Sequence, residues 1–179
     1  MIITIGGKPG SGKSTVAKEL AKKLSYRYYS IGDLRGQMAM ERGLTIDQLN
    51  ELGEKEAWTD TTVDDYTKKI GQTENNVVID SWLAWHLIPQ AVKIYLDVNA
   101  HEAARRIFAN PRPDEERQPN ANETKKLIER RYQQTLQRFR NIYQVETADL
   151  KNYDFIINTT NLTINQVLDK ILAYLTTQK

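Results

Sequence analysis

Short, unbroken apolar runs alternate with longer amphipathic patterns along this chain. Runs such as Val77-Val78-Ile79 are typical of strands that a parallel sheet buries on both faces. Between the runs, apolar residues recur every three or four positions, which is the spacing of one face of a helix. The runs predict strands at residues 1–5, 77–80, 92–98 and 154–158, and an aromatic, β-prone stretch predicts another at residues 26–30. The amphipathic patterns predict helices at residues 14–24, 32–42, 59–71, 100–108, 123–143 and 164–175, with a further helix beginning at residue 45.

Capping residues and helix breakers mark the ends of several of these helices. Thr45 and Gln48 have the spacing of a capping box, and Asn99 and Thr163 stand where helix N-caps are expected. Three prolines between residues 110 and 122 exclude a continuous helix there. Because helices flank this segment, we expect it to form a mobile flap.

The alternation of strands and helices predicts an α/β fold, in which a parallel sheet has helices on both faces and right-handed crossovers. In such sheets, ligands bind at the carboxyl ends of the strands. The polar residues that follow the first three strands, at residues 6–15, 30–35 and 80–82, therefore belong to one site. The segment 59–71 is mostly polar, so we expect it to cover this site instead of forming a layer of the core.

Residues 7–14 fit the phosphate-binding pattern G-x-x-x-x-G-K-[ST] at every fixed position. Glycines let the backbone curl around an anion with its N–H groups pointing inward. Lys13 can reach the β- and γ-phosphates of a nucleotide, and the Ser14 hydroxyl can bind Mg²⁺. An ordinary glycine-rich turn would also fit the pattern, but here a strand precedes it and a helix follows, as a phosphate-binding loop requires. The sequence therefore predicts a nucleotide-binding P-loop protein.

Asp80 ends the third predicted strand, where P-loop enzymes place a carboxylate that holds Mg²⁺ directly or through water. The alternative is that Asp80 only caps the segment that follows it. We favour the metal-binding role, because a P-loop enzyme needs such a group at this strand end.

The composition of the 179-residue chain narrows the classes of function. Its 25 basic and 23 acidic residues give a net charge of +2, which gives no case for nucleic acid or a membrane surface as a partner. The absence of cysteine excludes disulfides, thiol catalysis and cysteine-bound zinc. With no long apolar run and no visible export signal, we expect a cytoplasmic protein.

Beyond the P-loop, several segments make the chain resemble the nucleoside monophosphate kinases, and most closely the short, archaeal-type cytidylate kinases and their bacterial relatives. These segments are residues 5–17, 30–35, 80–85, 138–143 and 153–159. The resemblance implies a P-loop NTPase fold with a five-stranded parallel sheet in the order 2-3-1-4-5. It also implies a monomer with a single kinase domain over residues 1–179, a helical monophosphate-binding insert at about 32–72 and a short lid at about 109–122.

For function, the resemblance implies that the γ-phosphate of ATP is transferred to a pyrimidine nucleoside monophosphate, CMP or dCMP, with Mg²⁺ bound. Small-molecule nucleotides would thus be the only partners. The residues implied to bind ATP are Gly7, Gly10, Ser11, Gly12, Lys13, Ser14 and Thr15. Ser14 and Asp80 are implied as the metal ligands.

The same resemblance implies roles for residues outside the P-loop. Arg35 would hold the acceptor phosphate, while Asp60 and Asp64 would face the acceptor base or sugar. The residues implied to act on the transferring phosphoryl group are Lys13, Arg131 and Arg138, with Arg112 or Arg117 from the lid. Arginines on a long helix are often simply solvated, so this alternative stays open for the two helical arginines. Helical spacing places Arg131 and Arg138 on one face.

Trp82 stands where these kinases commonly have an acceptor-binding arginine. Tryptophan offers one N–H donor, so the bidentate phosphate clamp of an arginine is lost. Three interpretations remain open: Trp82 stacks on the base in a cytidylate kinase, it marks a kinase of a different small acceptor, or it fills the core. A nucleotide-binding regulator with weakened catalysis is a further alternative.

Overall fold

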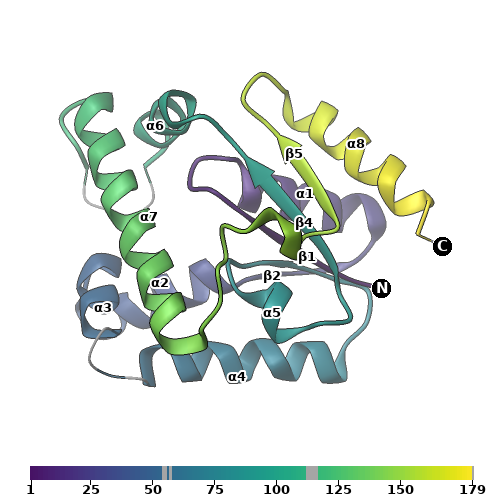
Figure 1. Ribbon diagram of the computed structural model, residues 1–179, viewed down its shortest axis with the longest axis horizontal. Helices are drawn as coiled ribbons and strands as arrows, with labels where there is room; N and C mark the ends of the chain where they lie inside the picture. Colours follow the sequence, from purple (N-terminus) through teal and green to yellow (C-terminus); the bar gives the residue numbers. More distant parts are fainter. Residues whose placement is uncertain (54–55, 57, 112–116, 179) are drawn as a thin grey trace.

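Five parallel strands form one sheet in the order β2-β3-β1-β4-β5 in the computed structural model of the protein (Figure 1). The structure describes residues 1–53, 56, 58–111 and 117–178. The strands are β1 (Ile2–Gly7), β2 (Arg27–Ser30), β3 (Val77–Asp80), β4 (Val92–Asp97) and β5 (Phe155–Asn158). The predicted strand order is confirmed, and each strand lies where the apolar runs place it.

The amphipathic patterns correspond to real helices. The helices are α1 (Lys13–Leu24), α2 (Ile31–Met40), α3 (Ile46–Gly53), α4 (Trp58–Thr73), α5 (Ala84–Leu87), α6 (Ala100–Ala109), α7 (Ala121–Tyr143) and α8 (Ile164–Thr176). Periodicity does not predict α5 or the 3₁₀ turn at Leu150–Asn152, because both are too short to show a repeat. In the part of the chain that the structure describes, no helix has the length and apolar character needed to cross a membrane.

The pairing register brings the carboxyl ends of the strands to one edge of the sheet. Asp80 at the end of β3 pairs with Ile5 of β1 and Ser30 of β2. On the other side of β1, Gly7 pairs with Leu96 of β4. The loops that follow β1, β2 and β3 therefore open on the same edge, as expected for a site built at the ends of parallel strands.

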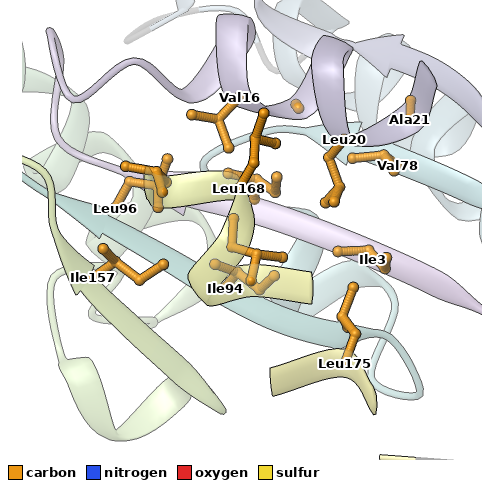
Figure 2. Close-up of a cluster of buried hydrophobic side chains, with 14 residues drawn as sticks. Ile3, Val16, Leu20, Ala21, Val78, Ile94, Leu96, Ile157, Leu168 and Leu175 are labelled. Carbon is orange, nitrogen blue, oxygen red and sulfur yellow. The ribbon is translucent and has the colours of Figure 1, made fainter. Parts of the chain in front are cut away.

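The larger core lies between the sheet and the helices α1 and α8 (Figure 2). Strand residues alternate between faces, so Ile3 and Ile5 point into this core and Ile2 points to the opposite face. Val16 of α1 and Leu168 of α8 are buried against the strands. Each such side chain stabilises the fold by about 1.5–3 kcal/mol. The P-loop is thus held between a buried strand and a buried helix face.

A second core lies on the opposite face of the sheet, against α4 and α5. It contains Val77 and Ile79 of β3, together with Ile70 of α4 and Ile88, which follows α5. The expectation that residues 59–71 cover the site without joining the core is therefore wrong. The C-terminal part of α4 packs on the sheet through Ile70, whereas the residues of α4 that line the cavity lie between Asp60 and Thr67.

The predicted capping residues occupy the helix ends. Thr45 and Gln48 exchange hydrogen bonds before α3, and Thr163 and Gln166 form a capping box at the start of α8. Asn99 caps α6 through its side-chain oxygen. Each cap contributes about 1 kcal/mol to the stability of its helix. Local sequence thus sets where these helices begin.

Helix α7 connects the two sides of the site. Figure 1 shows that the N-terminal end of α7 lies near α6 and that the C-terminal end of α7 lies near the start of α4. Arg131 in the middle of α7 forms an ion pair with Asp47 of α3, and Tyr143 at its end donates a hydrogen bond to Asp64 of α4. The position of α7 is therefore tied to the helices that follow β2.

Candidate active site

A cavity of about 1020 Å³ opens at the carboxyl ends of the strands. The P-loop, α2, the start of α4, the segment after β3, α7 and the loop between β5 and α8 all contribute to its wall. This volume lies at the upper end of the range for small-molecule sites, so two substrates can fit together. The cavity is lined by the predicted residues Gly10, Ser11, Gly12, Lys13, Ser14, Thr15, Arg35, Asp60, Asp64, Asp80, Trp82, Arg131 and Arg138.

Two glycines shape the P-loop for different reasons. Gly10 has a φ of +73°, and a Cβ there would come within 2.7 Å of the Cα of Ala103 on α6. At Gly7, a Cβ would come within 2.1 Å of the carbonyl oxygen of Leu96. Gly7 is not among the described residues that line the cavity, and its lack of a Cβ lets β1 lie close to β4. Its role in ATP binding remains a prediction.

The P-loop presents the groups that a polyphosphate needs. Helix α1 begins at Lys13 with no acidic residue in its first turn, so its N-terminal N–H groups and dipole favour an anion. The hydroxyl of Ser11 is buried and has no hydrogen-bond partner among the described residues. The ammonium group of Lys13 donates to the carbonyl oxygen of Lys8 at 2.9 Å, across the loop. These groups fit the phosphates of ATP.

Ser14 and Asp80 meet at the edge of the P-loop. The Ser14 hydroxyl donates to Oδ2 of Asp80 at 2.5 Å, and Asp80 is 5% exposed. The capping role considered for Asp80 belongs instead to Ser81, whose hydroxyl accepts from the N–H groups of Leu83 and Ala84. One carboxylate and one hydroxyl suit Mg²⁺, which retains waters and takes its other ligands from phosphates. The described residues contain no cluster of three or more metal-binding side chains, and a kinase-type Mg²⁺ site does not require one.

A buried charge network forms another part of the cavity wall. NH1 of Arg35 donates to Oδ1 of Asp60 at 2.9 Å and to the carbonyl oxygen of Thr59 at 2.7 Å. Nε of Arg138 lies 3.6 Å from Oδ2 of Asp60, and both arginines donate to Oδ1 of Asn50. Burial, followed by the charge of Arg138, lowers the pKa of Arg35 to about 10, so Arg35 is still charged at neutral pH. Two guanidinium groups share the Asp60 carboxylate, and both arginines line the cavity, where they can meet an anion.

Asp64 lies one helical turn beyond Asp60 on the same face of α4. It is 7% exposed and accepts a short hydrogen bond from the hydroxyl of Tyr143. Burial raises the pKa of Asp64 above its ordinary value, and the hydrogen bond from Tyr143 opposes this effect. The hydrogen bond from Tyr143 therefore orients the Asp64 carboxylate at the cavity wall.

Trp82 is half-buried and lines the cavity, so it is not a core residue. Nζ of Lys13 lies 5.6 Å from the centroid of its ring, within the range of a cation–π interaction. The ring also makes an edge contact with Tyr132 of α7, with centroids 5.4 Å apart. Trp85, by contrast, packs against Tyr153 and is not among the described cavity residues. The aromatic ring of Trp82 thus lies between the P-loop and α7.

The remaining predicted arginines have different surroundings. Arg131 lines the cavity beside Thr135 and is held by Asp47, with Nε–Oδ1 and NH2–Oδ2 distances of 2.8 and 2.9 Å. Arg117 is exposed and does not belong to the described cavity lining. Arg112 lies outside the residues that the structure describes. The roles of these three arginines remain predictions.

Arg106 of α6 is a structural element of the site that sequence analysis did not identify. Its guanidinium donates to the carbonyl oxygens of Gly10, Thr159 and Thr160, at 3.2, 2.8 and 3.3 Å. It is also paired with Glu102, whose pKa is lowered to about 2 by hydrogen bonds from Arg105 and Arg106. These bonds tie the P-loop to the loop after β5. No local pattern marks such a residue, because its partners are distant in sequence.

Comparison with known proteins agrees with this architecture. Residues 2–161 match the model of the cytidylate kinase-like family. The chain belongs to this family. It is accordingly a P-loop phosphotransferase, and the predicted resemblance is confirmed.

Individual relatives share most of this chain's length. The cytidylate kinase of Sulfurisphaera tokodaii is 34% identical over 177 residues, covering 98% of this chain and 95% of that protein. An S-adenosylmethionine-dependent nucleotide dehydratase of Lacinutrix mariniflava is 35% identical over 173 residues, covering 96% of this chain but 35% of the dehydratase. This chain therefore spans about a third of that relative. The solved shikimate kinase of Bacteroides thetaiotaomicron has a TM-score of 0.63 at 18% identity over 98% of both chains, which shows a shared fold.

Proposed function

We propose that the protein transfers the γ-phosphate of ATP to CMP or dCMP, with Mg²⁺ bound. The observation that carries the proposal is the joint cavity of about 1020 Å³, which is lined both by the P-loop and by the Arg35–Asp60–Arg138 network. One substrate's phosphates would lie on the P-loop and the other's would face the buried arginines. Direct transfer requires this arrangement, because a loose phosphoryl group passes in line between two oxygens.

The residues divide between the two substrates. The P-loop backbone and Lys13 hold the ATP phosphates, and Mg²⁺, which neutralises charge on them, is held by Ser14 and Asp80. Arg35 holds the acceptor phosphate, while Arg131 and Arg138 face the transferring group from α7. Little proton abstraction is needed for this chemistry, so positioning and charge neutralisation account for most of the catalysis.

The acidic residues favour an acceptor base that donates hydrogen bonds. Asp64 is a carboxylate on the cavity wall, and cytosine offers an N4 amino group where uracil has an O4 acceptor. The relatives named cytidylate kinase support the same acceptor. The runner-up is a different small acceptor, because Trp82 occupies the position of the expected arginine.

An acceptor panel tests the proposal. ADP release from ATP and Mg²⁺ is measured with CMP, dCMP, UMP, AMP, GMP and TMP in turn. Strong stimulation by CMP or dCMP alone is the expected result. If no nucleotide stimulates ADP release, the assignment of CMP or dCMP as the acceptor is wrong. If a different nucleotide stimulates it, that nucleotide is the acceptor.

Trp82→Arg is expected to lower the KM for CMP about tenfold, because the introduced guanidinium adds a charge-assisted contact to the acceptor phosphate. The cavity position of Trp82 beside Lys13 makes this contact possible. Steady-state kinetics at saturating ATP measure the change, with Trp85→Phe as a control outside the cavity. If the true acceptor is not a nucleotide, Trp82→Arg should instead lower the activity with that acceptor.

Asp80→Asn is expected to lower kcat about 100-fold and to raise the Mg²⁺ concentration needed for half-maximal rate. The amide keeps the size of the side chain and a hydrogen bond to Ser14 but removes the charge that attracts the cation. Initial rates against Mg²⁺ concentration check this prediction. Asp65→Asn, in which the replaced side chain is 78% exposed, is the matched control. An unchanged Mg²⁺ requirement would argue against a metal role for Asp80.

A further inference from the structure

We propose that Tyr143 determines acceptor selectivity by holding Asp64 as an oriented, ionised acceptor for the exocyclic amino group of cytosine. This inference rests on the proposed function, in which CMP or dCMP is the acceptor. Tyr143 acts through Asp64 and is therefore a positioning residue.

Tyr143 is placed for this role by the end of α7. It is the last residue of that helix, and its hydroxyl donates to Oδ2 of Asp64, which lies 79 positions away in sequence. Its ring packs against Phe139 at an angle of 62°, with centroids 5.9 Å apart. The contact therefore joins two helices at one defined carboxylate oxygen.

This hydrogen bond leaves the other oxygen of Asp64 available to a ligand. Among the described residues, no hydrogen bond reaches Oδ1 of Asp64, and the residue lines the cavity. Asp60 differs, because its oxygens are engaged by Arg35 and Thr59 and face Arg138. Asp64 is thus the better-placed carboxylate for a donor on the base.

The protonation state of Asp64 decides which base it can accept. An ionised carboxylate only accepts hydrogen bonds, so it suits the N4 amino group of cytosine and repels the O4 atom of uracil. A protonated carboxyl can donate to O4, and it would lose much of this discrimination. Selectivity for cytosine therefore depends on keeping Asp64 ionised as well as correctly oriented.

Several charges act on Asp64 besides Tyr143. Burial and the neighbouring carboxylates Asp60 and Asp65 raise its pKa, while the hydrogen bond from Tyr143 and the charge of Lys68 lower it. Arg35 of α2 also interacts with this carboxylate, and Arg138 of α7 faces the Tyr143 hydroxyl. Removing the hydroxyl leaves burial less opposed, so the pKa of Asp64 moves further upward. The protonated fraction of Asp64 then grows as the pH falls.

The test compares Tyr143→Phe with the wild type, using kcat/KM for CMP and for UMP between pH 6.0 and 8.5. We expect the CMP-to-UMP ratio to fall about tenfold at pH 6.0 and to recover toward pH 8.5, with the change mainly in KM. Tyr174→Phe is the matched control, since this tyrosine stacks on Phe155 beside β5 and is not among the described cavity residues.

A second variant keeps the proposal testable if Tyr143→Phe does not fold. Asp64→Asn presents both a donor and an acceptor at every pH, so its ratio should be low and independent of pH, and adding Tyr143→Phe should not lower it further. A ratio that stays at the wild-type value in Tyr143→Phe or Asp64→Asn, or equal losses for both acceptors at all pH values, would overturn the inference. A wild-type enzyme that phosphorylates neither pyrimidine would overturn the proposed function itself.

Discussion

Replacing Lys13 with alanine is expected to lower kcat for phosphoryl transfer from ATP about 1,000-fold. Lys13 lines the cavity, and its ammonium group lies 2.9 Å from the carbonyl oxygen of Lys8 and over the ring of Trp82. Among the described residues that line the cavity, no other residue of α1 is a cation. Lys13 alone on this helix can therefore neutralise the negative charge on the transferring oxygens. The missing charge therefore acts on the transition state more than on substrate binding, and the KM for ATP should rise much less.

Lys18→Ala is the control, because Lys18 is exposed on the same helix. Thermal unfolding separates catalysis from folding: loss of the hydrogen bond from Lys13 to the carbonyl oxygen of Lys8 costs about 1 kcal/mol. A Lys13→Ala enzyme that folds and keeps kcat within threefold of wild type would contradict the assignment of Lys13.

Arg35→Ala is expected to destabilise the protein by about 3 kcal/mol and to raise the KM for CMP about 100-fold. Asp60 is 3% exposed, and among the described residues the ion pair that it would keep without Arg35 is the one with Arg138, at 3.6 Å. The same substitution removes the guanidinium assigned to the acceptor phosphate. Chemical denaturation measures the first effect, and acceptor titration at saturating ATP measures the second.

Arg35→Lys separates the two effects. Lysine keeps the charge near Asp60, so much of the stability should return, but it cannot reproduce the several directed bonds of the guanidinium. The KM for CMP should therefore remain high. Arg42→Ala is the control, because Arg42 is exposed in the turn after α2, where it stacks on Trp58, and is not among the described cavity residues. A normal KM in both Arg35 variants would exclude Arg35 from acceptor binding.

The parts of the fold that the sequence predicts are those with local causes. Apolar runs mark the strands because both faces of the sheet are covered, and the P-loop is visible because its glycines, lysine and serine are contiguous. The strand order came from the resemblance, since periodicity does not report which strands are neighbours. The mixed role of α4 was missed because one polar helix serves the cavity at one end and the sheet, through Ile70, at the other.

The residues of the candidate site also divide into those that local sequence predicts and those that it does not. Ser14 and Asp80 were paired from the requirements of a P-loop, and they are in direct contact. Arg35, Asp60 and Arg138 came from family motifs, but sequence did not predict that they form one network around Asn50. Arg106 and Tyr143 were missed as site elements because their importance lies in partners 53 or more positions away. Such contacts depend on how helices pack, which no short pattern records.

The most direct test of cytidylate kinase activity follows the transferred phosphoryl group. ATP labelled in the γ-phosphate is incubated with the protein, Mg²⁺ and CMP, and the labelled products are separated and identified. We expect one labelled CDP for each ADP formed, with little labelled inorganic phosphate. Label that appears only as inorganic phosphate, or remains in ATP with both CMP and dCMP, would contradict a cytidylate kinase activity.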